Sequence, residues 1–334
     1  MVDPEVPQAS DRIPLAGTDL SIPPMGVGTW AWGDTSTWGM AGYDATLTMD
    51  SIRDAWAASI DAGVVLFDTA EVYGKGESER IIGRLLAEDP GVRSRVVIAS
   101  KFMPMPQKLN VDRALRTAVE GSLERLGIDA VDLYQIHGPI SLRSAGAMAE
   151  ALANAHADGL IRAIGVSNYS VREMRRIEAA LRQRGLRLAS NQVELSLLRT
   201  FPEAVGLLDA CRELEVVPLA YSPIGQGRLT GKYTASNPPP KGRNFSAHPM
   251  ELVDAVVAVV RDLGERHGRT PSQVALAWCM AKGAVPIPGA KSRRQAEENA
   301  GALGWALSAD ELAALDGVAL YGKRGLSQRL WQHG

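Results

Sequence analysis

Short apolar runs alternate along this chain with stretches in which apolar residues recur every three or four positions. The runs are nearly continuous and rich in β-branched residues, which is typical of parallel strands that are covered on both faces. Eight of them stand at residues 25–28, 64–67, 96–99, 131–136, 163–166, 189–193, 216–220 and 285–287. Each run is therefore predicted to be one strand of a parallel sheet.

The stretches between the runs predict helices. Residues 111–126 place their apolar side chains on one stripe, with Asn110 as a cap and Gly127 as a stop. Further helical signals are the apolar repeat over 78–86 and the capping boxes that begin at Thr270 and Ser308. Eight strand–helix units in unbroken succession predict an α/β protein with a (β/α)8 TIM barrel. An open doubly wound sheet is less favoured, because no strand is followed by the pattern G-x-G-x-x-G.

The parts of the chain outside this alternation complete the predicted architecture. Residues 15–20 predict a strand–turn–strand segment, a short N-terminal hairpin that would close the bottom of the barrel. After the seventh strand, residues 222–249 form a long connection rich in Gly, Pro, Ser and Asn, which is typical of a functional or mobile loop. We expect one domain over residues 1–334, with its core at about 15–317 and a C-terminal tail at 318–334.

Composition narrows the class of protein. Of the 334 residues 46% are apolar, which excludes a disordered chain, and the net charge of −2 gives no reason to expect nucleic acid or a membrane as partner. The N-terminus lacks an apolar signal segment, and no apolar run approaches the ~18 residues of a membrane span. The two cysteines, Cys211 and Cys279, suit a reducing compartment, so we expect a cytoplasmic protein. The scattered histidines offer no metal-binding spacing, and nothing in the sequence indicates an oligomeric state.

Polar residues close the predicted strands at their carboxyl ends, where catalytic side chains collect in such barrels. The second strand leads to Asp68 and Tyr73, the third to Lys101 and the fourth to His137. One polar residue at a strand end is ordinary, because strands exit into loops. These four lie on neighbouring strands and are expected to converge. An ammonium group near a phenol lowers the tyrosine pKa from about 10 towards neutrality, and such a tyrosine can act as a general acid.

The same residues stand within motifs that resemble the aldo-keto reductase superfamily. The motifs are FDTAEVY at 67–73, IGVSN at 164–168, YSP at 221–223 and IPGA at 287–290. The likeness extends from about Leu15 to about Asn299 and is nearest to the broad bacterial and plant-type members. It implies an oxidoreductase that acts on CH–OH groups and reduces aldehydes or ketones with a nicotinamide cofactor.

The resemblance also implies a role for each catalytic residue. Tyr73 would protonate the carbonyl oxygen, and Lys101 would lower the pKa of that phenol. Asp68 would hold Lys101 in place, and His137 would orient the carbonyl and aid proton delivery.

The cofactor, by the same resemblance, would lie along the strand ends. Ser167, Asn168 and Gln192 would hydrogen-bond the nicotinamide carboxamide, and Tyr221 would stack on the ring. The other residues expected to bind the cofactor are Thr29, Trp30, Asp68, Ser222, Pro223, Ile224, Gly225, Gln226, Lys232, Arg243, Gly289, Ala290, Lys291, Gln295, Glu298 and Asn299.

The segment after the last strand distinguishes between two cofactors. Residues 291–294 read Lys-Ser-Arg-Arg and place three cations and a hydroxyl group before a predicted helix. A helix N-terminus with cations beside it suits a phosphate dianion. NADP(H) is therefore favoured over NAD(H).

The substrate is expected to be a small carbonyl compound. Trp30 and Trp32 lie in the first strand–helix loop, and indoles near the mouth suit an apolar pocket, so both are expected to contact it together with Tyr73 and His137. Gly138 follows His137 where many relatives carry a larger or charged residue, which predicts a wider pocket there. In some relatives a C-terminal tail closes over the substrate, and the sequence at 320–334 leaves that question open.

Two other functions compete with this interpretation. Potassium-channel β subunits resemble the same family and bind the cofactor as regulatory partners, so a non-catalytic cofactor-binding protein is the main alternative. The presence of both Tyr73 and His137 favours chemistry instead. A Schiff-base lyase with Lys101 as its nucleophile is the third interpretation, and it would leave the carboxamide-binding cluster unexplained.

Overall fold

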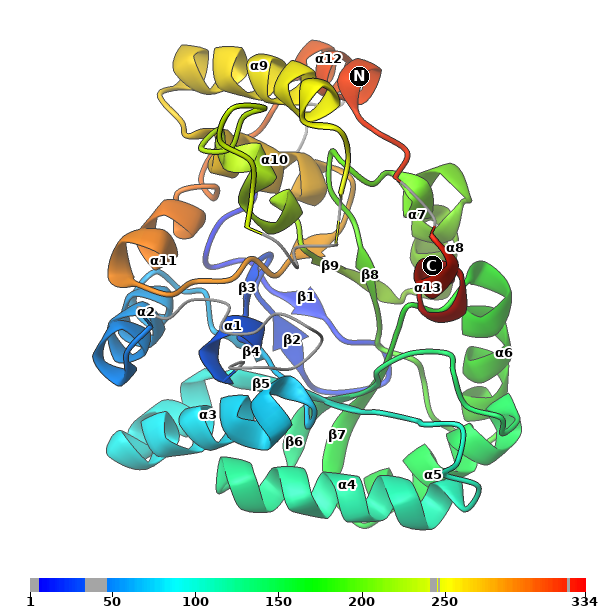
Figure 1. The fold of residues 1–334 in the computed structure, drawn as a ribbon. Helices are drawn as coiled ribbons and strands as arrows, with labels where there is room; N and C mark the ends of the chain where they lie inside the picture. The colour runs from blue at the N-terminus through cyan, green and yellow to red at the C-terminus, as the bar shows by residue number, and fades with distance from the viewer. Residues whose placement is uncertain (1–5, 34–46, 241–244, 246, 323–324) are drawn as a thin grey trace.

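The strands of the main sheet are all parallel and lie side by side in chain order. The computed structural model describes residues 6–33, 47–240, 245, 247–322 and 325–334. The order across the sheet is β10-β9-β8-β7-β6-β5-β4-β3, and the longer helices surround it (Figure 1). The strands are β3 (Gly26–Gly28), β4 (Leu66–Asp68), β5 (Val97–Phe102), β6 (Val131–Ile136), β7 (Ile161–Ser167), β8 (Ser190–Glu194), β9 (Val217–Tyr221) and β10 (Val285–Pro286).

The sheet closes on itself at Gly28. The Gly28 N–H donates to the Pro288 carbonyl oxygen at 3.0 Å, and Gly28 forms a parallel bridge with Gly289. A Cβ atom at position 28 would lie only 2.9 Å from the carbonyl oxygen of Ile287, so glycine permits this approach of β3 to the segment after β10. The result is a nearly closed (β/α)8 barrel, which confirms the predicted fold.

Alternation along the strands divides the apolar side chains between two layers. Leu66 faces the inside of the barrel, whereas its neighbour Phe67 faces the helices and packs on Trp56, with ring centroids 4.0 Å apart. A hairpin of β1 (Ile13–Pro14) and β2 (Ser21–Ile22) adds apolar side chains to the inner layer. The predicted hairpin is present and covers one end of the barrel, but its strands flank residues 15–20, which form the connection between them.

The helices follow the strands as predicted. The helix α4 has the predicted bounds, because the Asn110 side chain accepts from the Arg113 N–H and Gly127 takes a left-handed conformation at φ 64°. The helices are α1 (Trp30–Gly33), α2 (Met49–Asp61), α3 (Glu77–Glu88), α4 (Val111–Leu126), α5 (Ala145–Ala157), α6 (Val171–Arg182), α7 (Phe201–Ala204), α8 (Leu207–Leu214), α9 (Met250–His267), α10 (Pro271–Ala281), α11 (Arg293–Ala300), α12 (Ala309–Val318) and α13 (Leu326–Trp331). Short 3₁₀ helices occupy Tyr73–Gly76, Pro90–Arg95 and Gly225–Thr230.

Most strand bounds differ from the predicted runs by one to three residues, and two departures from the prediction bear on the site. The strand β5 continues to Phe102, because Ser100 and Lys101 stay in register with β6 although they end the apolar run. The long connection after β9 contains the 3₁₀ helix Gly225–Thr230, so part of it forms regular structure. Arg228 is buried there and donates to the carbonyl oxygen of Phe245 at 2.9 Å. Within the described ranges, no helix has both the length and the apolarity that a bilayer crossing requires.

Candidate active site

Four polar side chains from three neighbouring strand ends meet at one end of the barrel. Asp68 ends β4, Lys101 lies in β5, Tyr73 begins the 3₁₀ helix after β4, and His137 follows β6 directly. The Lys101 Nζ donates to Asp68 Oδ1 at 2.5 Å and to the Tyr73 hydroxyl oxygen at 3.3 Å. The structure therefore brings together the residues that the strand ends were predicted to gather.

Lys101 is fully buried, with 0% of its surface exposed, and its ammonium group is enclosed by acceptors. Besides Asp68 and Tyr73, it donates to the carbonyl oxygen of Thr69 at 2.8 Å. Burial lowers the pKa of Lys101, while the carboxylate of Asp68 opposes this by favouring the charged form. Because its hydrogens are directed at three fixed acceptors, the ammonium group cannot turn away from the phenol.

Asp68 is held from its other side by two glutamines. Its Oδ2 accepts from Gln135 Nε2 at 3.0 Å and from Gln192 Nε2 at 2.8 Å. Gln135 was missed in the sequence, although a signal existed. Side chains two residues apart on a strand point to the same face. Residues 133 and 135 of β6 therefore share a face with His137, so Gln135 also faces the barrel interior.

His137 stands between two aromatic rings. Its ring centroid lies 5.6 Å from that of Tyr73 and 5.5 Å from that of Trp331. Among the described residues, the buried Nδ1 atom has no hydrogen-bond partner. Burial, and then the positive charge of Lys101, hold the pKa of His137 well below its ordinary range. The imidazole is therefore neutral near pH 7 and keeps one N–H as a donor.

A cavity of about 1040 Å³ opens beside these residues. It reaches from Tyr73 and His137 along the ends of β7 and β9 to the start of α11. Residues that line it from the predicted site are Thr29, Trp30, Asp68, Tyr73, His137, Ser167, Asn168, Gln192, Tyr221, Ser222, Pro223, Ile224, Gln226, Lys232, Gly289, Lys291, Gln295, Glu298 and Asn299. Lys101 does not line the cavity and is buried behind these residues.

Comparison with known proteins identifies the family. The family model described as "Aldo/keto reductase family" matches residues 24–320. The chain belongs to the aldo/keto reductase family. It is an oxidoreductase of a family that binds nicotinamide cofactors. The chain is 36% identical over 326 residues to "Pyridoxal reductase, chloroplastic" from Arabidopsis thaliana, covering 94% of this chain and 87% of that protein.

Two solved structures share the fold of this aldo/keto reductase over most of their length. The glycerol dehydrogenase from Gluconobacter oxydans superposes with a TM-score of 0.79 and is 29% identical, covering 96% of this chain and 99% of the other. The aldo-keto reductase from Klebsiella pneumoniae in complex with NADPH has a TM-score of 0.74 and 27% identity, covering 96% and 98%.

In this aldo/keto reductase the residues predicted for the nicotinamide carboxamide bond to one another. Asn168 Nδ2 donates to Ser167 Oγ at 3.1 Å, and Ser167 Oγ donates to the carbonyl oxygen of Gln192 at 2.9 Å. The Tyr221 hydroxyl donates to Asn168 Oδ1 at 2.9 Å. The Gln192 amide nitrogen differs, because it points at Asp68 within the barrel.

At the other end of the cavity, the start of α11 is organised by its own polar residues. Ser292 caps the helix, its side chain accepting from the Gln295 N–H. Gln295 Oε1 accepts from the Lys291 N–H at 2.9 Å, and Asn299 Nδ2 donates to the carbonyl oxygen of Gly289 at 3.3 Å. Lys291 and Arg294 line the cavity beside them. A cationic helix N-terminus therefore faces the cavity.

Several predicted residues lie elsewhere. Trp32 does not line the cavity: its Nε1 donates to the carbonyl oxygen of Ala290 at 2.7 Å, and its ring packs in the core. Trp30 and Trp32 are two residues apart on α1, about 200° around a helix, so only Trp30 faces the cavity. Ala290 and Gly225 are likewise buried behind the lining residues. Arg243 lies outside the described residues.

The C-terminal tail supplies lining residues that the sequence did not identify. They are Gly325, Gln328, Leu330, Trp331 and Gln332. A Cβ atom on Gly138 would lie 3.1 Å from the Trp331 ring, so Trp331 occupies the space that this glycine leaves. The prediction of a wider pocket beside His137 is therefore wrong, because the side chain of Trp331, distant in sequence, fills the space.

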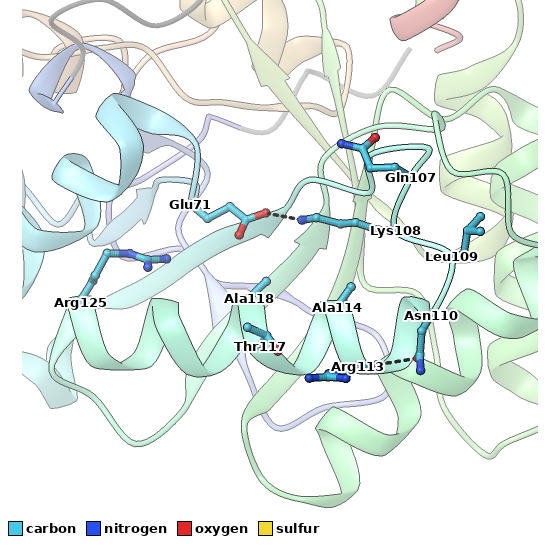
Figure 2. Close-up of a pocket in the computed structure, with 10 residues that line it drawn as sticks. All are labelled: Glu71, Gln107, Lys108, Leu109, Asn110, Arg113, Ala114, Thr117, Ala118 and Arg125. Atoms are coloured by element: carbon cyan, nitrogen blue, oxygen red, sulfur yellow. Dashed lines mark hydrogen bonds and ion pairs between the residues drawn. The ribbon is translucent and has the colours of Figure 1, made fainter.

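A second cavity of about 570 Å³ lies outside the barrel, beside the N-terminal half of α4 (Figure 2). The Glu71 carboxylate stands 3.7 Å from Lys108 Nζ across it and accepts from the Met103 N–H at 2.7 Å. Burial raises the pKa of Glu71. These contacts tie the loop that carries Tyr73 to the end of β5. In the part of the chain that the structure describes, no cluster of three His, Cys, Asp or Glu side chains could hold a metal ion.

Proposed function

We propose that this protein reduces aldehydes or ketones to alcohols with NADPH, and that Tyr73 supplies the proton. The observation that carries the proposal is the 3.3 Å contact between Lys101 Nζ and the Tyr73 hydroxyl oxygen at the edge of the large cavity. The cofactor, when bound, supplies the hydride. The volume of the cavity suits a dinucleotide together with a small substrate, with the proton donor at one end and cations at the other.

The chain itself performs the proton transfer and the orientation. Tyr73 gives its proton to the carbonyl oxygen, and the Lys101 ammonium group stabilises the phenolate that remains. Asp68 keeps the ammonium group charged and in place. The neutral His137 donates its N–H to the carbonyl oxygen and orients it. Trp30 lines the cavity beside Tyr73, with their ring centroids 6.3 Å apart, and limits the access of water.

The preference for NADP(H) over NAD(H) is part of the proposal. Lys291 and Arg294 line the cavity at the start of α11, and a 2′-phosphate would accept from both side chains and from the helix N-terminus. The complex of the Klebsiella pneumoniae relative with NADPH supports this choice. The predicted cofactor residues that line the cavity would hold the rest of the dinucleotide.

The Schiff-base alternative is disfavoured by the position of Lys101. A nucleophilic amine must reach the substrate carbonyl, but Lys101 is fully buried behind the lining residues and donates to three acceptors. We also keep three predictions from the sequence as proposals. The chain is one domain over residues 1–334, it acts in the cytoplasm, and its partner is a small carbonyl compound.

The experiment follows NADPH oxidation by absorbance with a panel of aldehydes and ketones. Pyridoxal belongs in the panel, because the Arabidopsis relative carries the name pyridoxal reductase. We expect turnover with some members, and Tyr73→Phe should lower kcat by about 10²–10⁴-fold while NADPH binding is kept. An undiminished Tyr73→Phe variant would remove the proposed acid. Tight NADPH binding without turnover of any carbonyl would favour the regulatory alternative.

A further inference from the structure

The end of the chain is anchored to the residues proposed for the nicotinamide ring. Gln332 is 1% exposed, and its Nε2 donates to Glu194 Oε2 at 2.7 Å and to the Tyr221 hydroxyl oxygen at 2.6 Å. The backbone N–H groups of His333 and Gly334 both donate to the carbonyl oxygen of Asn168 at 3.1 Å. The tail therefore contacts the cofactor side of the cavity as well as the substrate side.

A buried carboxylate determines which group donates and which accepts in each of these hydrogen bonds. Glu194 is fully buried and lies 3.5 Å from the Arg199 guanidinium group, so as an ionised partner it offers acceptors only. Gln332 must then present its NH₂ group, and both hydrogens of that group are used. Since Gln332 donates into the Tyr221 oxygen, the hydrogen of that hydroxyl is left for Asn168 Oδ1.

The hydroxyl group of Tyr221 keeps that hydrogen. Burial, and then the negative charge of Glu194, raise the pKa of Tyr221 well above its ordinary range. The phenol therefore keeps its hydrogen near neutral pH, and that single hydrogen cannot serve two acceptors.

The hydrogen bond from Tyr221 in turn sets the donor and acceptor roles in the proposed carboxamide site. Because Asn168 Oδ1 accepts from Tyr221, its Nδ2 faces the other way and donates to Ser167 Oγ, with a longer contact of 3.5 Å to the His137 carbonyl oxygen. Ser167 then passes its own hydrogen to the Gln192 carbonyl oxygen. The orientation of the Asn168 amide follows from the orientation of Gln332.

We propose that Gln332 is a positioning residue that sets the hydrogen-bond direction of Asn168 and Ser167 for the nicotinamide carboxamide. This inference rests on the proposed function, in which those two residues bind that group. A carboxamide has one accepting and one donating end, so a reversed Asn168 amide would present it with the wrong atom. Gln332 reaches the cavity wall, but the role proposed for it is exerted through its hydrogen bond to Tyr221.

The first experiment measures binding of the nicotinamide end of the cofactor separately from binding of its adenosine end. Gln332→Met keeps the length of the side chain and removes its hydrogen bonds, and Gln183→Met, at an exposed glutamine after α6, is the control. Binding is measured by fluorescence titration with NADPH and by competition with adenosine 2′,5′-bisphosphate, which lacks the nicotinamide. We expect Gln332→Met to weaken NADPH binding about tenfold and to leave the bisphosphate unchanged. Unchanged NADPH binding, or equal weakening of both ligands, would overturn the proposal.

A second experiment keeps the tail docked but reverses the direction. In Glu194→Gln with Gln332→Glu, the new amide at position 194 can donate to the new carboxylate at position 332. That carboxylate then draws the Tyr221 hydrogen away from Asn168. We expect NADPH binding to stay about tenfold weaker than in the unmodified protein. Recovery of full affinity would show that Gln332 serves only to attach the tail.

These measurements are independent of turnover. If the unmodified protein binds NADPH but reduces no carbonyl compound, the proposed function fails while the role of Gln332 is still decided by the two ligands. If it does not bind NADPH, both proposals fail together.

Discussion

The indole of Trp331 stands over Gly138 so closely that a Cβ atom at position 138 would lie 3.1 Å from the ring. The same indole meets the His137 imidazole edge-on, at 5.5 Å between ring centroids. The substrate side of the imidazole is therefore bounded by the C-terminal tail and not by the residue that follows His137 in the chain. The size of the pocket depends on a side chain that the tail delivers.

Removal of this indole should relax the size limit of the pocket. We expect Trp331→Ala to raise kcat/KM for a bulky aromatic ketone about tenfold relative to a short aldehyde, because apolar pockets discriminate by about 1–3 kcal/mol per group removed. Leu142→Ala, at a leucine that is 73% exposed and does not line the cavity, is the control and should leave the ratio unchanged. Equal ratios in both variants would mean that Trp331 does not limit the substrate.

The buried pair of Lys101 and Asp68 should be costly to break from one side. Lys101→Met leaves the Asp68 carboxylate without its cation, and we expect the free energy of unfolding to fall by about 3–5 kcal/mol. The double variant Asp68→Asn with Lys101→Met removes both charges and should recover part of this loss. Denaturant unfolding monitored by tryptophan fluorescence measures all three proteins. A double variant less stable than Lys101→Met would contradict the account.

His137 should make the stability depend on pH in the acid range. Its pKa in the folded protein lies well below the ordinary value, so below about pH 6.5 the unfolded chain binds a proton that the folded protein does not. The free energy of unfolding therefore falls as the pH falls below that value, by up to about 1.4 kcal/mol per pH unit from this group. His137→Asn should lose this part of the slope. Parallel curves for the two proteins between about pH 5 and pH 7.5 would contradict the shift.

Two adjacent arginines allow a matched test of the cofactor preference. Arg294 lines the cavity, whereas Arg293 is exposed, does not line it and lies 3.5 Å from Glu297. We expect Arg294→Ala to raise the KM for NADPH about tenfold and to leave the KM for NADH unchanged, since NADH has no 2′-phosphate. Arg293→Ala should change neither value. A loss shared by both cofactors would mean that Arg294 contacts a part that they have in common.

The sequence predicted the barrel and the core of the site because both depend on local patterns. Near-continuous apolar runs mark buried parallel strands, and the rule that chemistry lies at strand ends places Asp68, Lys101 and His137 together without coordinates. Gln135 could have been found by the same reasoning, because it lies two residues before His137, and side chains two residues apart on a strand point to the same face.

Other residues could not be placed from local patterns. Trp32 looked equivalent to Trp30 in a loop, but the structure forms a helix there and turns the two indoles to opposite sides. The positions of Trp331 and Gln332 depend on contacts with β6, β8 and β9, and no periodicity in the tail indicates them. Long-range packing of this kind has no signature in neighbouring residues.

The joint between β3 and the segment after β10 has a consequence for biosynthesis. Residues 28 and 288 are far apart in the chain. During synthesis β3, the first strand of the barrel, therefore stays unpaired along one edge until nearly the whole polypeptide has left the ribosome. An open edge of this kind can pair with a foreign strand and aggregate. Because β3 is only three residues long, its unpaired edge is short. The nascent chain therefore offers little template for aggregation before β10 is made.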